Sequence, residues 1–432
     1  MALTDEAGSA LAEAGRGLGG PRPPFEPLTA LELLVGMPFG EVEPDLGGSP
    51  GVSGVAPSVP RATATNPRAV LEEVVTAALT RPPCLVQFSG GRDSSALLAI
   101  AAAVARRHGL PLPVPVTFRY EDDLSAEAEW QELVVTHVGL DEWVRIEVGG
   151  ELGLVGPVAR RLLGRYGFVP PAPLYTALVV FELGRGGTRM TGEGGDDLLR
   201  ARRGAPFLEV WSHPAAALRP GVARGIAAAG MPRAMRRARW ERRMEAKLEL
   251  PWVRPAARRE LVARIAADLA DEPVSWRRAL KRYGRNRGDW LLARNSQLLA
   301  DKYDVACVDP LLHPAVVDAV GAHFAPFGVR SRTEALGVLV GDLLPDRVVS
   351  RTTKASFNRS YLTDEGRSFA RAWSGRGVDP DLVDPEALRD EWCSPFPSGL
   401  SFALLQAAWL GDHGRTVEVA PEHTDGDRGR CR

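Results

Sequence analysis

Short apolar runs and helical patterns alternate most clearly between residues 67 and 148. Three short apolar runs have the length and composition of buried strands: Cys84–Phe88, Leu112–Tyr120 and Trp143–Val148. Helical patterns precede and separate them, at Pro67–Leu79, Ala96–His108 and Ser125–Val138. Strands that alternate with helices indicate βαβ units, so the pattern predicts an α/β fold with a mostly parallel sheet and helices on both of its faces.

The loop after the first predicted strand, SGGRDSS, is polar and rich in glycine. Its two glycines allow backbone angles that residues with a Cβ seldom adopt, and Asp93, Ser94 and Ser95 are good N-cap residues. We therefore expect a tight turn into a helix whose free N–H groups converge on one spot, which attracts an anion such as phosphate. The alternative is an ordinary capped turn between a strand and a helix.

A second run of glycines beside acidic residues lies at Arg189–Leu199, RMTGEGGDDLL. A nucleoside triphosphate needs Mg²⁺, which prefers one or two carboxylates together with phosphate oxygens. Asp93 from the first loop and Asp196 from this run are the candidate metal ligands. The alternative is that Asp196 and Asp197 only cap the start of a helix.

The overall composition is that of an ordinary globular enzyme, with 45% apolar and 25% charged residues. A net charge of −1 gives no general attraction to nucleic acid or membranes. The sequence contains neither a signal peptide nor an apolar run long enough to span a membrane. The four cysteines are far apart in the sequence, at Cys84, Cys307, Cys393 and Cys431. This spacing matches neither a metal site nor a disulfide framework, so we expect a protein of the reducing cytoplasm.

Basic residues are distributed unevenly along the chain. Residues 200–287 contain 22 Lys or Arg against 8 Asp or Glu, a net charge of +14. We expect a solvated helical insert there, and the alternative is a surface for RNA or an acidic substrate. Only four of the 53 basic residues are lysines. This chain therefore seldom uses lysine as an ordinary surface residue, which favours a functional role for Lys354.

Three motifs in order resemble the synthetase domain of asparagine synthetases and their relatives, which are PP-loop ATP pyrophosphatases. They are SGGRDSS at Ser89–Ser95, TGEGGDD at Thr191–Asp197 and LLPDRVVSRTTKASF at Leu343–Phe357. The resemblance extends from roughly Pro67 to His413 and is weakest at 200–287. It implies a PP-loop α/β fold with a helical insert and a helical C-terminal part. It also implies Mg²⁺-dependent cleavage of ATP to AMP and pyrophosphate.

The expected domain organisation follows from this resemblance. Residues 1–67 form a loop-rich N-terminal segment, 68–416 the synthetase-like domain with its insert at 200–287, and 417–432 a disordered tail. Glutamine-dependent asparagine synthetases begin with a glutaminase domain whose nucleophile is a cysteine after the initiator Met. Residue 2 is Ala here, and only 88 residues precede Ser89. We therefore expect no complete glutaminase domain. The nucleophile would be free ammonia, ammonia from a separate glutaminase, or another amine.

The resemblance also implies a nucleotide site. Its phosphates would be held by Ser89, Gly90, Gly91, Asp93 and Ser94. The backbone at Phe88 and Tyr120 would flank the adenine, and Thr191 and Gly192 would line the site. Asp93 and Asp196 match magnesium ligands of the family.

Two further residues would act on the reacting groups. Attack of a carboxylate on the α-phosphate makes an acyl-adenylate, from which AMP leaves easily. Lys354 matches the family's lysine that stabilises charge on the transition state and the departing pyrophosphate, a role that suits a compact cation. Glu193 matches the acid that accepts a proton from the attacking amine, which reacts only when neutral.

The substrate itself is left open. Where the family often has Glu-x-Arg-x-Pro-Phe-Leu-Asp, this chain has ACVDPLLH at Ala306–His313, without the charged positions that free aspartate would need. Relatives with altered pockets include β-lactam synthetases and lasso-peptide cyclases, which join a carboxylate and an amine of one molecule. A small-molecule carboxylate or a precursor peptide is therefore the expected partner. A PP-loop enzyme acting on tRNA is the alternative from another class.

Overall fold

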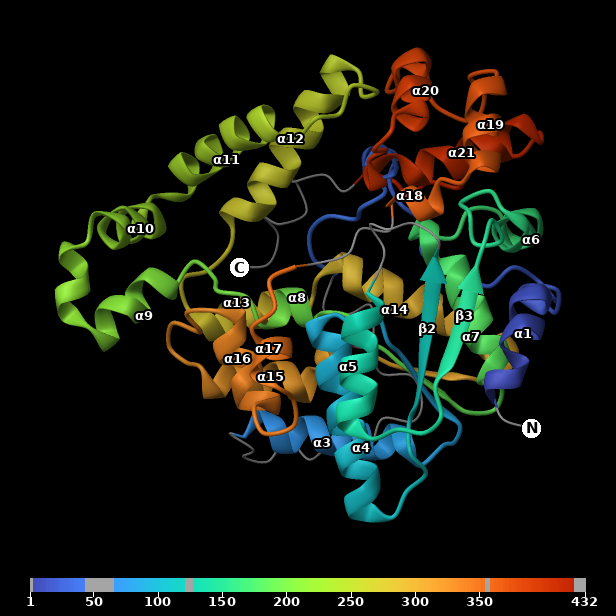
Figure 1. Cartoon of the computed structure of the whole chain (residues 1–432). Coiled ribbons are helices and arrows are strands. Elements are labelled where there is room, and N and C mark those ends of the chain that lie inside the picture. The colour runs from blue at the N-terminus through green and yellow to red at the C-terminus, as the bar shows by residue number, and fades with distance from the viewer. Residues whose placement is uncertain (1–2, 43–65, 121–126, 354–357, 423–432) are drawn as a thin grey trace.

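The computed structural model describes residues 3–42, 66–120, 127–353 and 358–422 (Figure 1). In this described part of the chain the strands form one parallel sheet of five, in the order β3-β2-β1-β4-β5. The strands are β1 (Cys84–Gln87), β2 (Val114–Tyr120), β3 (Val144–Val148), β4 (Thr188–Met190) and β5 (Ala306–Val308). The predicted α/β class with a parallel sheet is confirmed. The sequence pattern located the first three strands, whereas β4 and β5 have only three residues each and give no pattern.

Alternate residues of the strands face two separate apolar cores, because successive side chains of a strand point to opposite faces. In β1, Leu85 belongs to one core and Val86 to the other. Both faces of the sheet are therefore buried at its centre, which explains why β1 is a nearly continuous apolar run, whereas the edge strand β3 alternates between buried and exposed residues.

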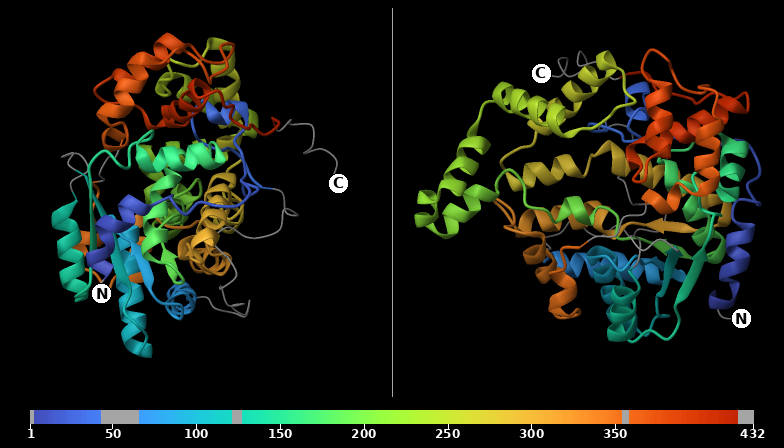
Figure 2. Two further views of the ribbon diagram at one scale, coloured as in Figure 1. Left: turned by 90° about the vertical axis from the view of Figure 1, so that its right-hand side faces the viewer. Right: turned by 45° about the horizontal axis from the view of Figure 1, so that its top comes forward.

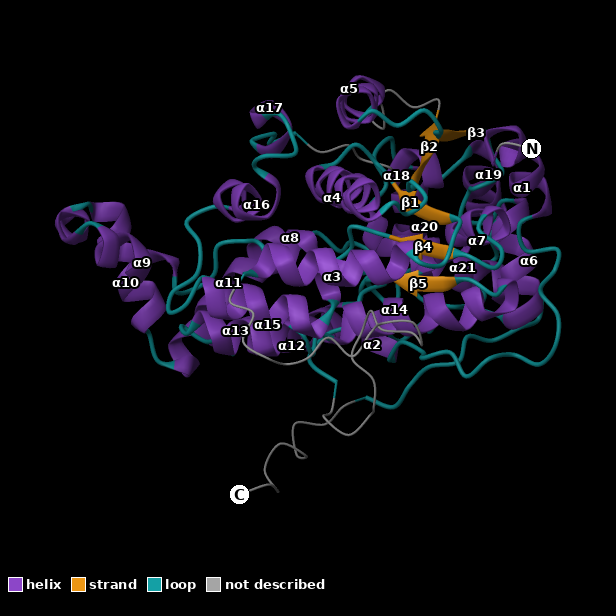
Figure 3. Cartoon of the chain, turned by 90° about the horizontal axis from the view of Figure 1, so that it is seen from below, coloured by secondary structure: helices purple, strands orange, loops and turns teal. Residues whose placement is uncertain are grey.

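Helices cover both faces of the sheet (Figure 1 and Figure 3). The core that contains Val86 is built with α3 (Pro67–Leu79), α4 (Arg92–His108), α5 (Ala128–Val138), α13 (Trp276–Tyr283), α15 (Pro314–His323), α16 (Arg332–Val340) and α17 (Asp346–Val349). The core that contains Leu85 is built with α1 (Ala7–Glu13), α2 (Ala30–Leu33), α6 (Pro157–Tyr166), α7 (Ala177–Leu183), α14 (Arg287–Ala300), α19 (Asp364–Ala372), α20 (Pro385–Cys393) and α21 (Phe402–Asp412). The short helix α18 (Asn358–Tyr361) lies between the third motif and α19.

Glycine, rather than aspartate or serine, occupies the N-cap position of both loop helices. Gly91 caps α4, so Asp93, Ser94 and Ser95 lie within the first turn. Gly194, with φ of 84°, caps α8 (Gly195–Leu198), and Asp196 and Asp197 lie in its first turn. The expectation that Asp93, Ser94 or Ser95 caps the first helix is therefore wrong, and so is the alternative that Asp196 and Asp197 cap the second. The left-handed backbone at Gly194 admits glycine most readily.

The Arg-rich insert is helical, as expected, and projects away from the sheet as an arm (Figure 1 and Figure 2). It contains α9 (Ala205–Ser212), α10 (Pro220–Gly230), α11 (Arg233–Lys247) and α12 (Pro255–Ala270), with α11 packed along α12. Both ends of the arm are fixed to one loop. Before the arm, the Arg202 guanidinium donates to the Asp197 carbonyl at 2.6 Å, and after it the Tyr283 hydroxyl donates to the Gly194 carbonyl at 2.9 Å.

The N-terminal segment packs into the domain despite its short helices. Phe25, Leu28 and Leu34 are buried in one core, and the Trp252 indole donates to the Leu34 carbonyl at 2.9 Å. Residues 417–422, expected in a disordered tail, pair with this segment, because the Ala420 N–H donates to the Leu28 carbonyl at 2.8 Å. The rest of that tail, 423–432, lies outside the described residues. None of the described helices has the length and apolar character that a membrane span requires.

A buried ion pair joins the N-terminal segment to α14. The Arg287 guanidinium lies 2.7 Å from the Glu32 carboxylate, and their side chains are 8% and 2% exposed. The same carboxylate accepts from the backbone N–H groups of Thr29 and Phe39. Glu32 therefore stabilises the turns of the N-terminal segment and also bonds this segment to α14.

We expect Glu32→Ala to lower the free energy of unfolding by about 3–5 kcal/mol, because it leaves the buried Arg287 charge uncompensated. Chemical denaturation measures this change. The matched control is Glu13→Ala, which removes an exposed ion pair with Arg16 and should cost no more than about 1 kcal/mol. Equal effects of the two substitutions would contradict the assigned role of Glu32.

Candidate active site

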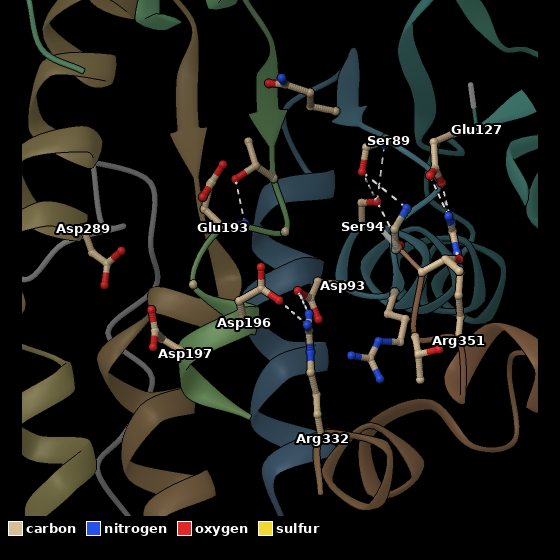
Figure 4. Close-up of a pocket in the computed structure, with 18 residues that line it drawn as sticks. Ser89, Asp93, Ser94, Glu127, Glu193, Asp196, Asp197, Asp289, Arg332 and Arg351 are labelled. Atoms are coloured by element: carbon tan, nitrogen blue, oxygen red, sulfur yellow. Dashed lines mark hydrogen bonds and ion pairs between the residues drawn. The ribbon is translucent and has the colours of Figure 1, made fainter. Parts of the chain in front are cut away.

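A cavity of about 490 Å³ opens where the loops after β1 and β4 meet. Because β1 and β4 are neighbouring parallel strands, their carboxyl ends lie at the same edge of the sheet. Eighteen residues line the cavity (Figure 4). They come from these two loops, from Glu127 and Asp289, from the start of α16 and from the segment after α17. Residues more than 200 positions apart therefore share one pocket.

The loop after β1 is folded by its own serines. The Ser94 hydroxyl donates to the Gly91 carbonyl at 3.1 Å and accepts from the Ser89 N–H at 3.3 Å. Gly90 has φ of 82°, in the region that favours glycine. The turn leads into the 17-residue helix α4, whose first amides have no partner within the helix. Such a turn at a helix start attracts anions.

The second loop touches the first at backbone distance. A Cβ on Gly192 would lie 2.8 Å from the Ser94 nitrogen, and a Cβ on Gly195 only 2.3 Å from the Asp93 Cγ. Gly192 and Gly195 are therefore required by the close approach of the two motifs. This approach also brings the acids of the two loops together.

Asp93 and Asp196 converge on a single guanidinium. Arg332, the first residue of α16, forms ion pairs with both carboxylates (Figure 4). Burial raises the pKa of Asp93 although Arg332 opposes the shift, and within the described part of the chain its Oδ1 is buried without a hydrogen-bond partner. Two carboxylates directed at one point match the donor set that Mg²⁺ prefers when phosphate oxygens complete its shell.

The other side of the cavity is acidic. Glu193, Asp197 and Asp289 line it (Figure 4). Burial, together with the charges of Asp197 and Glu193, raises the pKa of Asp289 to about 7. Next to these acids, the Thr191 hydroxyl donates to the buried Asp309 carboxylate and accepts from the Glu193 N–H at 3.2 Å. Thr191 thereby fixes the backbone from which the Glu193 side chain extends.

The third motif reaches the cavity from α17. Arg351, Thr352 and Thr353 line it, and Arg351 forms a buried ion pair with Glu127. Lys354, the predicted catalytic lysine, lies outside the described residues. The chain immediately before it is nevertheless at the cavity wall.

Most of the residues predicted from the sequence are brought together. The cavity is lined by Ser89, Gly91, Asp93, Ser94, Thr191, Gly192, Glu193 and Asp196. Phe88, Gly90 and Tyr120 are not among the described residues that line it. The Phe88 side chain is buried in a core, Gly90 faces Gln131, and Tyr120 packs edge-on against Tyr361. The predictions for Phe88 and Tyr120 concern their backbone.

Several lining residues were missed by sequence reasoning: Gln87, Arg92, Glu127, Asp289, Arg332 and Arg351. Arg351 lies inside the third motif, so the Arg-x-x-Lys spacing was the available signal. Arg332 and Asp289 are in the first turns of helices whose sequences look like ordinary capped starts, Ser331-Arg332 and Asn286-Arg287. Nothing local distinguishes them.

The family model described as asparagine synthase matches residues 67–397. That range contains all three motifs, the cavity and the Arg-rich arm. No curated protein sequence matches the chain.

We expect Gly195→Ala to weaken ATP binding at least about tenfold, because its Cβ would displace the Asp93 carboxylate. Calorimetric titration with ATP and Mg²⁺ measures the affinity. The matched control is Gly164→Ala on α6, where an added Cβ meets no atom within 4 Å. Unchanged affinity in the Gly195 variant would show that the two loops need not touch.

The raised pKa of Asp289 predicts a pH dependence of stability. The folded protein holds a proton there more tightly than the unfolded chain, so the free energy of unfolding falls as pH rises from about 4 to about 7. We expect Asp289→Asn to remove this fall. The free energy of unfolding of the variant, relative to that of the unsubstituted protein, should then rise by at least about 1 kcal/mol from about pH 5 to about pH 8. Denaturation of both proteins at the two pH values tests this, and parallel pH profiles would refute it.

Proposed function

The chain belongs to the asparagine synthase family, and from this premise we propose that it activates a carboxylate as an acyl-adenylate and converts it into an amide. Family membership makes ATP-dependent amide-bond ligation its general activity. One observation supports the proposal of an acyl-adenylate: the first two motifs and the segment that leads to Lys354 line the same cavity.

The loop after β1 supplies the phosphate side of the cavity. Its serine hydroxyls and the first amides of α4 favour the phosphate oxygens, and Arg92 in the first turn of α4 adds positive charge. Arg332 and Arg351 lie at the same loop, paired with carboxylates. Asp93 and Asp196 would hold Mg²⁺, which supplies charge neutralisation to the phosphates when bound.

In the first step a carboxylate oxygen of the substrate attacks the α-phosphorus of ATP. The bond between the α-phosphorus and the bridging oxygen breaks, and pyrophosphate leaves. Negative charge accumulates on the phosphoryl oxygens, so fixed cations and amides stabilise the transition state. We assign Lys354 to this step because its motif matches the family and Thr353, its neighbour, lines the cavity.

In the second step an amine attacks the acyl carbon, the carbon–nitrogen bond forms, and AMP leaves. The amine must lose a proton to become and remain neutral. Glu193 is the proposed acceptor of that proton. Its backbone is held by Thr191, and its side chain lines the acidic side, away from the phosphate loop (Figure 4).

The charge distribution in the cavity bears on the nucleophile. The acidic side attracts a protonated amine before it reacts. A free aspartate would need a cation for its α-carboxylate, but Arg332 and Arg351 are on the phosphate side and paired with carboxylates. The arrangement therefore favours an amine-bearing substrate, and an intramolecular cyclisation of the β-lactam or lasso-peptide type is the second candidate.

An exchange assay between ATP and labelled pyrophosphate, run against a panel of amino acids and peptides, tests the proposal. We expect exchange and AMP release that depend on a particular carboxylate. Amines are then added to the active carboxylate, and the amide product is identified by mass spectrometry. Absence of exchange with every carboxylate, in a protein that binds ATP, would contradict the proposal.

Two variants separate the half-reactions. We expect Lys354→Ala to lower exchange at least about a hundredfold, because it removes charge stabilisation in adenylation. We expect Glu193→Gln to retain exchange while amide formation falls by about a hundredfold or more, because only proton transfer is lost. The controls are Lys247→Ala on α11 and Glu260→Gln on α12, both exposed on the arm. Equal loss of both half-reactions in the Glu193 variant would contradict its assigned role.

A further inference from the structure

We propose that the buried ion pair between Glu127 and Arg351 is a positioning clamp. It fixes the peptide planes of the phosphate loop and makes the loop's geometry depend on docking of the segment after α17. This inference rests on the proposed function, because it concerns how the same cavity binds ATP.

The pair has the geometry of a fork. Arg351 contacts both oxygens of Glu127, with Nη2 at 2.5 Å from Oε1 and Nη1 against Oε2. Both side chains are only 5% exposed. The guanidinium also lies over the Trp130 ring, with its Cζ 4.6 Å from the ring centroid. Two parallel hydrogen bonds and a stacked face fix its orientation, which a lysine cannot reproduce.

The clamp reaches the phosphate loop through the loop's carbonyls. Arg351 Nη1 donates to the Gly90 carbonyl at 3.1 Å, and Gln131 Nε2, one turn into α5, donates to the Ser89 carbonyl at 3.2 Å. Across a trans peptide the N–H points opposite to the C=O. Holding these two carbonyls on one side therefore directs the N–H groups of Gly90 and Gly91 to the other side.

The direction of one of these amides agrees with this account. The Gly91 N–H lies 3.3 Å from the Ser89 hydroxyl, and Ser89 and Gly91 both line the cavity. Gly90 is enclosed on its other side, because a Cβ there would lie 3.0 Å from Gln131 Cγ and 3.4 Å from Glu127 Oε2. The start of α5 thus contacts the loop at Gly90, and the Gly91 N–H donates to the Ser89 hydroxyl at the cavity wall.

The charge of Glu127 distinguishes a clamp from a direct contact. A carboxylate at a phosphate site repels the ligand, so a role for Glu127 in binding ATP has to be indirect. If Arg351 acted only by touching phosphate, neutralising Glu127 would leave ATP affinity equal or higher. If the pair positions the loop, neutralising either partner lowers the affinity.

The experiment measures the dissociation constant of ATP, with Mg²⁺, by calorimetry for Glu127→Gln, Arg351→Gln, Arg351→Lys and the double variant. We expect each single substitution to weaken binding at least about tenfold, and the double variant to resemble the single ones. Arg351→Lys should not restore binding, since it keeps the charge but not the fork. Unchanged or improved affinity in Glu127→Gln would overturn the proposal, as would restoration by lysine.

The matched control is Glu32→Gln, in the buried pair of Glu32 and Arg287, neither of which lines the cavity. It should lower thermal stability without changing the affinity for ATP. If Glu127→Gln fails to fold, Gln131→Met replaces it, because this nearly isosteric change removes only the donor to the Ser89 carbonyl. We expect a smaller loss of affinity there, and no loss would overturn the proposal.

Failure of the clamp and failure of the proposed function are distinguishable. If the unsubstituted protein binds ATP and all variants bind it equally, the clamp is wrong and the proposed reaction stands. If the unsubstituted protein does not bind ATP, the proposed function is wrong.

Discussion

The close contact between the loops after β1 and β4 is the constraint on which the rest of the site depends. Two hydrogen-bonded parallel strands deliver their loops to one edge of the sheet, and the glycines of the second loop let its backbone lie directly against the start of α4. A side chain at Gly192 or Gly195 would separate them. The shared placement of Asp93 and Asp196 on Arg332 follows from this contact, and so does the division of the cavity into two sides.

That division gives the cavity its chemical character. Amides, hydroxyls and arginines paired with carboxylates gather around the phosphate loop, whereas Glu193, Asp197 and Asp289 gather on the opposite side. A reaction that first expels an anion and then admits an amine needs both environments within a short distance. The pKa of Asp289 is raised because its carboxyl is buried and because Asp197 and Glu193 are nearby acids.

Sequence patterns predicted the parts of this arrangement that depend on local signals. The apolar runs located β1, β2 and β3, and the glycine-rich motifs located the two loops. The patterns gave the wrong N-caps, because they favour aspartate and serine where the backbone turn required glycine. Arg332, Asp289 and Glu127 could not be predicted, since each reaches the cavity only through tertiary packing. Three-residue strands and the burial of residues 25–35 likewise have no local signature.

The attachment of the Arg-rich arm has a consequence for how such a protein varies. Its two ends are held to the Gly194–Asp197 loop, by Arg202 on the way out and by Tyr283 on the way back. Between these anchors, Trp252 and α13 belong to the cores, whereas α9 and α11 contain no buried residue. Insertions or deletions between α9 and α11 would therefore extend into solvent. The sequence from α9 to α11 can therefore change without moving the loops that line the cavity.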